Sequence, residues 1–427
     1  MPNPSAPSLA HPHPVRAYSL EAKRQGEHGR AVIVAGGGPV GLTVALMLGR
    51  AGVAVTLFDQ GDIIHSQPRA ATIHPATLDI LDDLGAYALL EPQGIVCPIV
   101  NYYDGKLLLA SFDHALLKDE TRHPWVLQCE QDKLSRTLFA MAKRHSNIIF
   151  RTATKVVGCS QRHDEVEVVV EAADGRQERH HALYLVGADG ARSTIRKAIG
   201  VEFEGFTYPE RCMIIGTPYD FAADGYVSRN YIADPQEWYN LFKISWRGPP
   251  GIYRLVAPLR SDEPLERERA LATAQRKLQR FNPRADAYEI AFYDNYTVAQ
   301  RVAATFRRGR VLLAGDSAHL NSPIGAMGMN SGIHDAVNLA SSLICVLSGE
   351  QSDAALDRYV RQRRHVATAH VQTATIANKQ SLEQRDPVKR QRYRDEMRRR
   401  ADDPALAKAF LMRTALVDSL RDAAKIA

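Results

Sequence analysis

Three glycines with the spacing Gly-x-Gly-x-x-Gly are the first residues in this chain whose pattern implies a chemistry. They are Gly36, Gly38 and Gly41, and they lie between an apolar run, VIVA, and a stretch rich in alanine and leucine. Between a strand and a helix, the first glycine permits a tight turn, the second lets the backbone approach a pyrophosphate, and the third allows the helix to pack closely. Peptide N–H groups at the helix start then face the phosphates. The spacing therefore predicts a dinucleotide site.

Three aspartates extend this predicted site. Asp59 ends the next apolar run, where its carboxylate can accept both hydroxyl hydrogens of an adenosine ribose. Asp189, which is followed by Gly190, and Asp316 each come at the end of a predicted strand. A carboxylate at Asp316 suits a polyhydroxyl chain, and a helix that begins near Gly328 would stabilise negative charge on a reduced flavin. NAD needs neither arrangement, so the set favours FAD.

The elements that must position these residues follow from hydrophobic periodicity. Residues 30–60 have the pattern strand, helix, strand, while residues 205–300 read mostly as strands with one charged helix at about 264–281. Further predicted elements are helices at 70–90, broken at Gly85, and at 128–145, strands at 165–172, 180–190 and 310–316, and helices to the end of the chain.

The order of these elements predicts an α/β fold: a Rossmann-like FAD-binding domain with an inserted strand-rich substrate domain and C-terminal helices. The predicted segments are a flexible N-terminal tail at 1–29, a discontinuous FAD-binding domain at 30–204 and 301–345, a β-rich substrate domain at 205–300, and a C-terminal helical region at 346–427. The C-terminal helices are also a candidate surface for a homodimer.

The composition narrows the classes of partner. Hydrophobic residues make up 45% and charged residues 24% of the 427 positions, as in ordinary soluble enzymes. The net charge of +6 is concentrated in runs such as MRRR at 397–400, but no aromatic residues alternate with them, so we expect no nucleic-acid partner. No apolar run has the length of a signal peptide or a bilayer span, and the five cysteines show no metal or redox spacing. We therefore expect a cytoplasmic protein with no membrane partner and no metal.

The motifs, in this order and spacing, resemble those of the single-component flavoprotein aromatic hydroxylases. The resemblance extends over about residues 30–345 and weakly into the helices beyond. The family loop PPxGGQGMN has become SPIGAMGMN here, with Ser322, Ala326 and Met327 as departures. The positions that the resemblance implies for FAD binding are Gly36, Gly38, Pro39, Val40, Gly41, Asp59, Gln60, Arg69, Gln131, Asp189, Gly190, Asp316, Pro323, Gly328, Met329 and Asn330.

This resemblance also implies a reaction. NADH or NADPH reduces FAD, dioxygen adds to the flavin, and the resulting hydroperoxide transfers one oxygen atom to an electron-rich ring, phenolic or N-heteroaromatic. The expected partners are a small aromatic substrate and O2. Because the glycine turn, Asp189 and Asp316 all serve the cofactor, we expect the strand-rich segment to cover the reactive face of the flavin and form the other wall of the pocket.

Two kinds of side chain are candidates for substrate chemistry. Hydroxyl or imidazole groups could pass a proton from a phenol, and cations could hold an acidic substrate. The candidates are Tyr226, Tyr231, Tyr239, Tyr253 and His74 for the first role, and Arg229, Lys243, Arg247 and Arg254 for the second. Strand alternation does not say which face of the sheet meets the flavin, so all of them stay candidates.

Other functions remain open at this level. A halogenase is disfavoured because its W-x-W-x-I-P signature is absent and the tryptophans, Trp125, Trp238 and Trp246, are scattered. A reductase, a membrane-associated quinone-ring hydroxylase or epoxidase, and a flavin-binding interaction protein without enzymatic activity are the remaining alternatives. Substrate-stimulated oxidation of NADH or NADPH, with gain of oxygen in the product, separates the hydroxylase from all of these.

Overall fold

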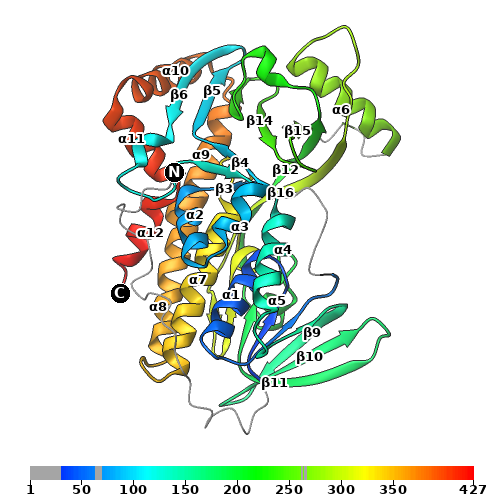
Figure 1. The fold of residues 1–427 in the computed structure, drawn as a ribbon, viewed down its shortest axis with the longest axis vertical. Helices are drawn as coiled ribbons and strands as arrows, with labels where there is room; N and C mark the ends of the chain where they lie inside the picture. Colours follow the sequence, from blue (N-terminus) through cyan, green and yellow to red (C-terminus); the bar gives the residue numbers. More distant parts are fainter. Residues whose placement is uncertain (1–29, 63–69, 261–262, 264–266) are drawn as a thin grey trace.

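The computed structural model describes residues 30–62, 70–260, 263 and 267–427 (Figure 1). Its first sheet has a parallel core in the order β18-β11-β1-β2-β8, and β9 and β10 extend it as antiparallel strands beside β11. The members are β1 (Arg30–Ala35), β2 (Val55–Phe58), β8 (Ile148–Arg151), β9 (Thr154–Gln161), β10 (Val166–Ala172), β11 (Gln177–Gly187), β17 (Arg307–Arg308) and β18 (Val311–Leu313). Val32, Val34 and Leu57 are fully buried, as expected for parallel strands covered on both faces.

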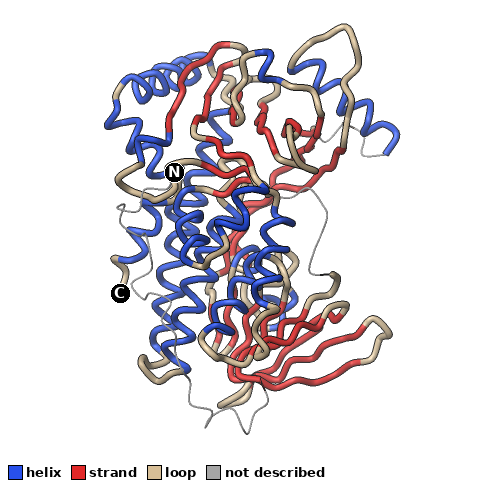
Figure 2. The backbone as a smooth tube through the Cα atoms, in the orientation of Figure 1, coloured by secondary structure: helices blue, strands red, loops and turns tan. Residues whose placement is uncertain are grey.

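The second sheet lies at the other end of the molecule, where red strands gather at the top of Figure 2. Its strand order is β19-β16-β12-β15-β14-β13-β5-β6. The members are β5 (Ile99–Asp104), β6 (Leu107–Asp113), β12 (Phe203–Thr217), β13 (Arg229–Ala233), β14 (Tyr239–Ile244), β15 (Ile252–Leu259), β16 (Phe292–Ala303) and β19 (His319–Leu320). The strand-rich segment thus forms most of a single sheet, which is completed by β5, β6 and β19, three strands that the sequence pattern did not predict.

A small third sheet joins the two halves. It consists of β3 (Thr72–Ile73), β7 (Val126–Gln128) and β4 (Ile95–Cys97). Around it lie α2 (Pro75–Asp83), α3 (Tyr87–Leu90) and α4 (Gln131–Ala142). As the sequence predicts, Gly85 separates α2 from α3, and its φ of +67° suits glycine. The domain boundaries proposed from the sequence stay a prediction.

Close packing of two helices brings the glycine turn next to the Asp316 segment. Helix α1 (Pro39–Arg50) lies against α7 (Gly328–Leu347), with Val40 between them. A Cβ atom on either Gly315 or Gly332 would lie only 2.8 Å from the Val40 Cγ2 atom, so larger residues do not fit there. Small residues at these positions therefore allow segments almost 300 residues apart in sequence to meet at the start of α1.

Helices cover the two faces of the second sheet differently. Helix α6 (Arg267–Phe281) packs on one face, and its apolar residues share a buried cluster with Met213, Ile215 and Leu255. The opposite face belongs to a cluster that includes Ile324 and residues of the C-terminal helices. Those helices are α8 (Ala354–His365), a π-helical segment (Val366–Gln372), α9 (Thr373–Leu382), α10 (Pro387–Asp402), α11 (Pro404–Thr414) and α12 (Val417–Ala424).

Local sequence signals explain how the C-terminal helices begin. Both α10 and α11 start at an Asp-Pro pair, in which Asp386 and Asp403 accept hydrogen bonds from backbone N–H groups of the first turn. Arg390 and Arg394 of α10 then form ion pairs with Asp104 at the end of β5. Within the described ranges, no helix combines the length and apolar character needed to cross a bilayer.

Candidate active site

The glycine turn has the geometry that its spacing predicts. Gly36 has a φ of +106°, and a Cβ atom there would lie 2.2 Å from the carbonyl oxygen of Ala188. A Cβ atom on Gly41 would lie 1.9 Å from the carbonyl oxygen of Gly36, so the fold itself requires both glycines. At Gly38, in contrast, a Cβ atom would meet no heavy atom within 4 Å. The backbone at Gly38 therefore faces open space at the start of α1.

The start of α1 suits an anion. Its N-cap residue is Gly38, so no side chain caps the first turn, which contains no acidic residue. The Asp59 carboxylate lies beside the turn, accepting hydrogen bonds from the N–H groups of Gly37 at 2.6 Å and Gly61 at 2.9 Å. These bonds fix its orientation and leave lone pairs for further donors such as ribose hydroxyls. The uncapped helix end, the open space and this acceptor together fit the pyrophosphate and adenosine of FAD.

Asp189 and Asp316 are held by different means. Asp189 accepts hydrogen bonds from Ser193 Oγ at 2.6 Å and the Ile195 N–H at 3.1 Å, so it orders the start of α5 (Thr194–Ala198), and burial raises its pKa. Asp316 lies exposed in the 3-10 turn Gly315–Ser317 after β18. The N–H of Gly315 donates to the buried Asp335 carboxylate at 3.1 Å, which fixes the turn that carries Asp316.

Asn330 joins the loop before α7 to the strand before α2. Its Oδ1 accepts a hydrogen bond from the His74 N–H at 2.9 Å, and its Nδ2 donates to the carbonyls of Thr72 at 2.9 Å and Ala326 at 2.8 Å. His74 also reaches the loop directly, because its Nε2 atom lies 2.8 Å from the Gly325 carbonyl oxygen. The predicted flavin loop is thus held against β3 and the start of α2.

The departures from the family loop have visible structural effects. Ala326 stands where the family motif has glycine, and its φ is +57°, in the left-handed region that glycine prefers. Met327 is buried beside Ile324 in the cluster that reaches the second sheet. The Ser322 N–H donates to the side chain of Gln300 on β16. Ser322 and Met327 therefore connect the loop to the second sheet.

The remaining positions implied for FAD are spread around this turn and loop. Pro39 and Val40 are the first residues of α1, and Gln60 follows Asp59 with an exposed side chain. Gln131 begins α4, and its N–H donates to the Ala70 carbonyl at 2.8 Å. Pro323, Gly328 and Met329 lie in the loop or the first turn of α7, and Gly190 has a φ of +77°. Arg69 lies outside the described residues.

Three of the candidate tyrosines lie on the face of the second sheet that α6 covers. Tyr226, Tyr239 and Tyr253 pack in one cluster with residues such as Phe281 of α6. The Tyr239 hydroxyl donates to Glu237 Oε2 at 2.9 Å. The structure therefore does not bring Tyr226 or Tyr239 to the predicted flavin loop, and their proposed catalytic role gains no support from this placement.

Tyr231 lies on the opposite face of the sheet. It shares a buried cluster with Ile324 and Met327, and the ring of Tyr102 stacks on it with centroids 5.1 Å apart and planes at 17°. Arg229 Nη2 donates to the Tyr231 hydroxyl at 3.1 Å. The same face carries the side chains of Arg254, Cys212 and Tyr296. Arg254 and Cys212 are buried, and Tyr296 packs against this cluster. Strand alternation thus separates these candidates from those under α6.

The charge of Arg229 acts on two buried histidines. Burial, followed by the Arg229 charge, lowers the pKa of His74 to about 3. Burial and the same charge lower the pKa of His114 to about 4. Both imidazoles are therefore neutral at neutral pH, and the positive charges of this sheet face are the guanidinium groups of Arg229 and Arg254.

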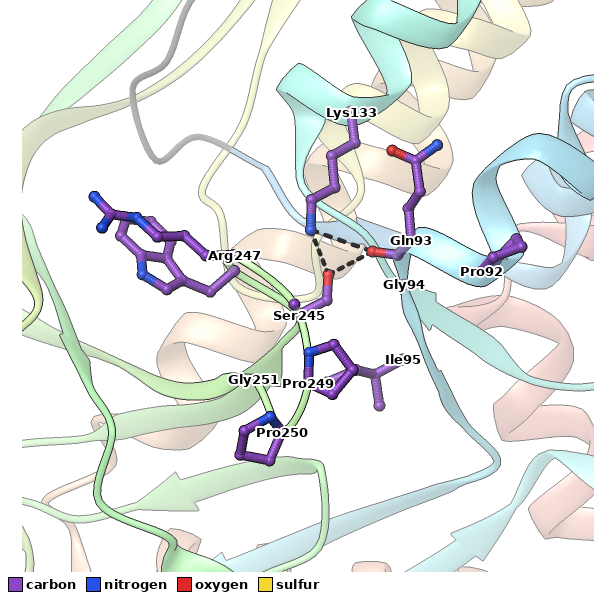
Figure 3. A pocket seen from close by; sticks show the side chains of 12 residues that line it. Pro92, Gln93, Gly94, Ile95, Lys133, Ser245, Arg247, Pro249, Pro250 and Gly251 are labelled. Carbon is purple, nitrogen blue, oxygen red and sulfur yellow. Dashed lines mark hydrogen bonds between the residues drawn. The ribbon is translucent and has the colours of Figure 1, made fainter.

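Arg247 lies elsewhere, at an open pocket of about 430 Å³ between β4, the start of α4 and the turn from β14 to β15 (Figure 3). Lys133 Nζ donates there to Ser245 Oγ at 2.7 Å. Arg247 is exposed, stacks over the Trp246 ring and points away from the Lys133–Ser245 contact. Glu130 accepts a hydrogen bond from the Trp246 N–H and holds this turn. Arg247 is therefore separate from the Arg229 group, by which we mean Arg229 and the side chains around it, Tyr231, Tyr102, His74 and His114.

Sequence reasoning missed several members of the Arg229 group. Tyr102 and His114 come from β5 and the turn after β6, and neither follows a recognisable motif. Their proximity to Arg229 depends on the parallel pairing of β5 with β13, which joins segments about 130 residues apart. Periodicity predicts strands but not the pairing of distant strands.

Comparison with known proteins places this geometry in a family. Residues 30–374 match the model of a family described as "FAD binding domain", a span that includes the glycine turn, Asp189, Asp316 and the loop before α7. The chain belongs to this family. FAD is accordingly the cofactor, and the turn, the uncapped helix and the acceptors described above fit it.

Two relatives narrow the class. Para-nitrophenol 4-monooxygenase from Pseudomonas sp. (strain WBC-3) is 33% identical over 384 residues, which cover 89% of this chain and 94% of that protein. The 3-(3-hydroxy-phenyl)propionate/3-hydroxycinnamic acid hydroxylase of Mycobacterium avium (strain 104) is 31% identical over 369 residues, covering 83% of this chain but only 62% of that protein.

A solved structure agrees with these relatives. The crystal structure of p-nitrophenol 4-monooxygenase from Pseudomonas putida DLL-E4 matches with a TM-score of 0.86 at 31% identity, covering 92% of this chain and 98% of that one. The α/β fold and the membership of the FAD-dependent aromatic hydroxylases, which use a nicotinamide nucleotide as co-substrate, are confirmed. The roles of individual residues stay predictions.

Proposed function

We propose that this flavoprotein monooxygenase hydroxylates a small phenol that lies between the second sheet and the loop at residues 321–328, using NADH or NADPH and O2. The observation that carries the proposal is the group formed by Arg229 and Tyr231 on the sheet face that meets Ile324 and Met327 of the loop. The names of the relatives refer to a nitrophenol and a hydroxyphenyl acid, which are both phenols. A phenolic ring matches this mixture of apolar walls and few polar groups.

Each part of the chain has a proposed role toward the cofactor. The start of α1 and Asp59 hold the pyrophosphate and the adenosine ribose, while Asp316 holds the ribitol. The loop from Pro323 and the first turn of α7 lie along the flavin ring. When bound and reduced, FAD supplies the activation of dioxygen that oxygen transfer needs.

The residues of the second sheet orient the substrate and exclude water. Phe242, Ile324 and Met327 are buried in one cluster with Tyr231 and supply apolar surface for the ring. The Tyr231 hydroxyl and the Arg229 guanidinium supply donors for an oxygen substituent. A site with little exposed surface protects reactive oxygen species from water and from release as peroxide.

The test uses purified protein reconstituted with FAD. NADH and NADPH oxidation are measured with a panel of para-substituted phenols, hydroxyphenyl acids and hydroxylated N-heteroaromatics, together with product mass under ¹⁸O2 and the peroxide released. We expect at least one phenol to accelerate oxidation and to gain one ¹⁸O atom. Acceleration with peroxide as the sole product for every compound would contradict the proposal.

Two further assignments complete this proposal. The five cysteines are free thiols, which supports the cytoplasmic location expected from the sequence. A homodimer through the C-terminal helices remains a proposal that sedimentation of the FAD-loaded protein can test. Sedimentation as a monomer at micromolar concentration would overturn it.

A further inference from the structure

Two glutamine side chains hold the backbone at the point where the chain leaves β19 and enters the flavin loop. Gln372, the last residue of the π-helical segment, donates from Nε2 to the Leu320 carbonyl at 2.7 Å. Gln300 of β16 accepts the Ser322 N–H through its Oε1 atom. The start of the loop is therefore tied both to the second sheet and to the C-terminal helices.

The Gln300 amide joins the loop to α9 through buried hydrogen bonds. Its side chain is 1% exposed, and Nε2 donates to Thr375 Oγ1 on α9 at 3.0 Å. Thr375 Oγ1 donates in turn to the Val371 carbonyl at 2.7 Å. Ser322 and Thr375 are buried as well. Because a buried polar group is costly unless it is hydrogen-bonded, Gln300 favours one arrangement of the loop relative to α9.

The far end of the loop is held from the side of β3 and α2. His74 Nε2 lies 2.8 Å from the Gly325 carbonyl oxygen, and Asn330 Nδ2 donates to the Ala326 carbonyl at 2.8 Å. Burial, followed by a nearby arginine charge, lowers the pKa of His74 to about 3, so its imidazole is neutral. The loop is thus fixed at both ends by uncharged groups, which position the backbone without adding a charge to it.

The π-helical segment determines where Gln372 points. Arg363 of α8 pairs with Asp335 of α7, which fixes the preceding helix. Gln372 comes nine residues after Arg363, and in an uninterrupted α-helix this is about two and a half turns, which puts the two side chains on opposite sides. A π-helix closes each hydrogen bond over one more residue, so the chain turns by less along the segment. The segment therefore allows both contacts to form together.

We propose that Gln300 and Gln372 are positioning residues for the hydroxylation. They hold the start of the loop in the conformation that keeps the flavin ring beside the substrate, and so connect the C-terminal helices to oxygen transfer. When the loop is not held, the hydride of NADH or NADPH and a proton reduce O2 to H2O2. When it is held, the same two electrons leave one oxygen atom on the substrate ring and the other in water. This inference rests on the proposed function, which places the flavin ring along this loop.

Amide hydrogen exchange tests the contacts without turnover. Because Gln300 protects the Ser322 N–H, Gln300→Met should speed exchange in peptides that cover residues 319–327. One hydrogen bond between uncharged groups shifts a local opening equilibrium by about two- to tenfold, which is the increase that we expect. The measurement is made with and without FAD, and peptides from β10 serve as the internal reference. Unchanged exchange in the loop would overturn the inference.

The fraction of NADH or NADPH oxidation that ends as H2O2 tests the positioning role. With a phenol that the wild type hydroxylates, Gln300→Met and Gln372→Met should each raise this fraction by about two- to tenfold. Both should also change the visible circular dichroism of bound FAD.

Two control variants accompany this measurement. Gln380→Met is the matched control, because Gln380 lies exposed on α9, and it should leave the H2O2 fraction and the flavin spectrum unchanged. Tyr184→Phe removes the hydrogen bond from the Tyr184 hydroxyl to Asp353, at the first sheet, and controls for a loss of stability alone. An H2O2 fraction that rises equally in Tyr184→Phe and in the two loop variants would overturn the inference.

Gln372→Glu separates hydrogen bonding from packing. Glutamate has the shape of glutamine, but its ionised carboxylate only accepts hydrogen bonds and would face the Leu320 carbonyl. We therefore expect Gln372→Glu to release at least as much H2O2 as Gln372→Met. A milder effect of glutamate would show that side-chain shape matters and donation does not, which would contradict the role given to Gln372.

The outcomes separate this inference from the proposed function. If no phenol gains oxygen in the wild type, the hydroxylation is wrong, while faster loop exchange and an altered flavin spectrum in the methionine variants still support the positioning of the flavin. If a phenol gains oxygen and neither Gln300→Met nor Gln372→Met releases more H2O2 than the wild type, the function stands and the inference is wrong.

Discussion

Arg363 Nε donates to Asp335 Oδ1 at 2.6 Å, and both side chains are almost completely buried. The second oxygen of Asp335 lies 2.7 Å from His319 Nε2 and accepts the N–H of Gly315 at 3.1 Å. One carboxylate therefore connects α7, α8, β19 and the turn that carries Asp316. Although burial raises the pKa of Asp335, the charges of Arg363 and His319 outweigh it and hold the value at about 2.

Asp335→Ala should destabilise the protein strongly, because it leaves the Arg363 charge buried without a partner. Breaking such a pair on one side costs about 3–5 kcal/mol of unfolding free energy. Urea unfolding of the FAD-loaded protein measures the loss. Asp357→Ala is the control, since Asp357 pairs with Arg307 at an exposed position and should change stability little. Equal, small effects for both variants would contradict the role given to Asp335.

The same pair predicts a pH dependence. The folded-state pKa of Asp335 is lower than its unfolded value of about 3.9, so its ion pair stabilises the protein fully above that pH. Stability from this group should be lost as pH falls from about 4 toward 2. Unfolding followed by circular dichroism over this range, in wild type and Asp335→Asn, isolates the contribution because the variant carboxamide does not titrate. An equal loss of stability in the wild type and in Asp335→Asn over this pH range would contradict the contribution assigned to Asp335.

Gly38 and Gly41 should respond differently to alanine. Gly41→Ala puts a Cβ atom 1.9 Å from the Gly36 carbonyl oxygen and should prevent correct folding of the turn. Gly38→Ala meets no protein atom within 4 Å, so the chain should fold while the new methyl group obstructs the pyrophosphate. Circular dichroism and FAD titration separate the two effects. Undiminished FAD affinity in Gly38→Ala would argue against a pyrophosphate at this position.

Ala326 should tolerate glycine better than valine. Its φ of +57° strains any residue with a Cβ atom, and the strain is greater for a β-branched residue. Ala326→Gly should keep FAD affinity and change stability by less than about 1 kcal/mol, because relief of strain opposes greater unfolded-state entropy. Ala326→Val should weaken FAD binding by distorting the loop next to Asn330. FAD titration and thermal unfolding test both, and equal affinities would mean that the loop conformation does not affect the flavin.

Asp104 should fix helix α10 to the second sheet. Its side chain is fully buried and pairs with both Arg390 and Arg394. Asp104→Asn keeps the shape but removes the charge, so we expect faster amide hydrogen exchange in residues 387–402. Exchange in α1 serves as the internal reference, since α1 packs in the other half of the molecule. Unchanged exchange in α10 would show that apolar packing alone holds it.

The sequence predicts local elements and the cofactor motifs well, for physical reasons that act over short distances. Gly36, Gly41 and the strands around them follow from spacing and periodicity. Strand alternation also places Arg229 and Tyr231 on one face of their strand. The pairing of Arg229 with Phe242 is needed to put Lys243 on the other face, and alternation alone cannot say which face meets the loop. That choice depends on packing between distant segments.

Long-range pairing accounts for what the sequence could not predict. Tyr102 reaches Tyr231 only because β5 pairs in parallel with β13. The absence of a carboxylate near Arg229, within the described residues, is likewise a property of the assembled core. The positions of the acidic residues along the sequence do not predict whether one of them lies beside Arg229 in the folded protein.

The pairing of β5 with β13, and the packing of α10 and α11 over this part of the second sheet, affect how the chain folds during synthesis on the ribosome. β5 emerges about 125 residues before its partner β13 is made, and α10 follows some 150 residues after β13. The apolar face around Tyr102 and Tyr231 therefore stays uncovered during most of translation, when exposed surface promotes aggregation. Nascent chains that end between β13 and α10 therefore expose this face most, because both strands are present and the covering helices are not yet made.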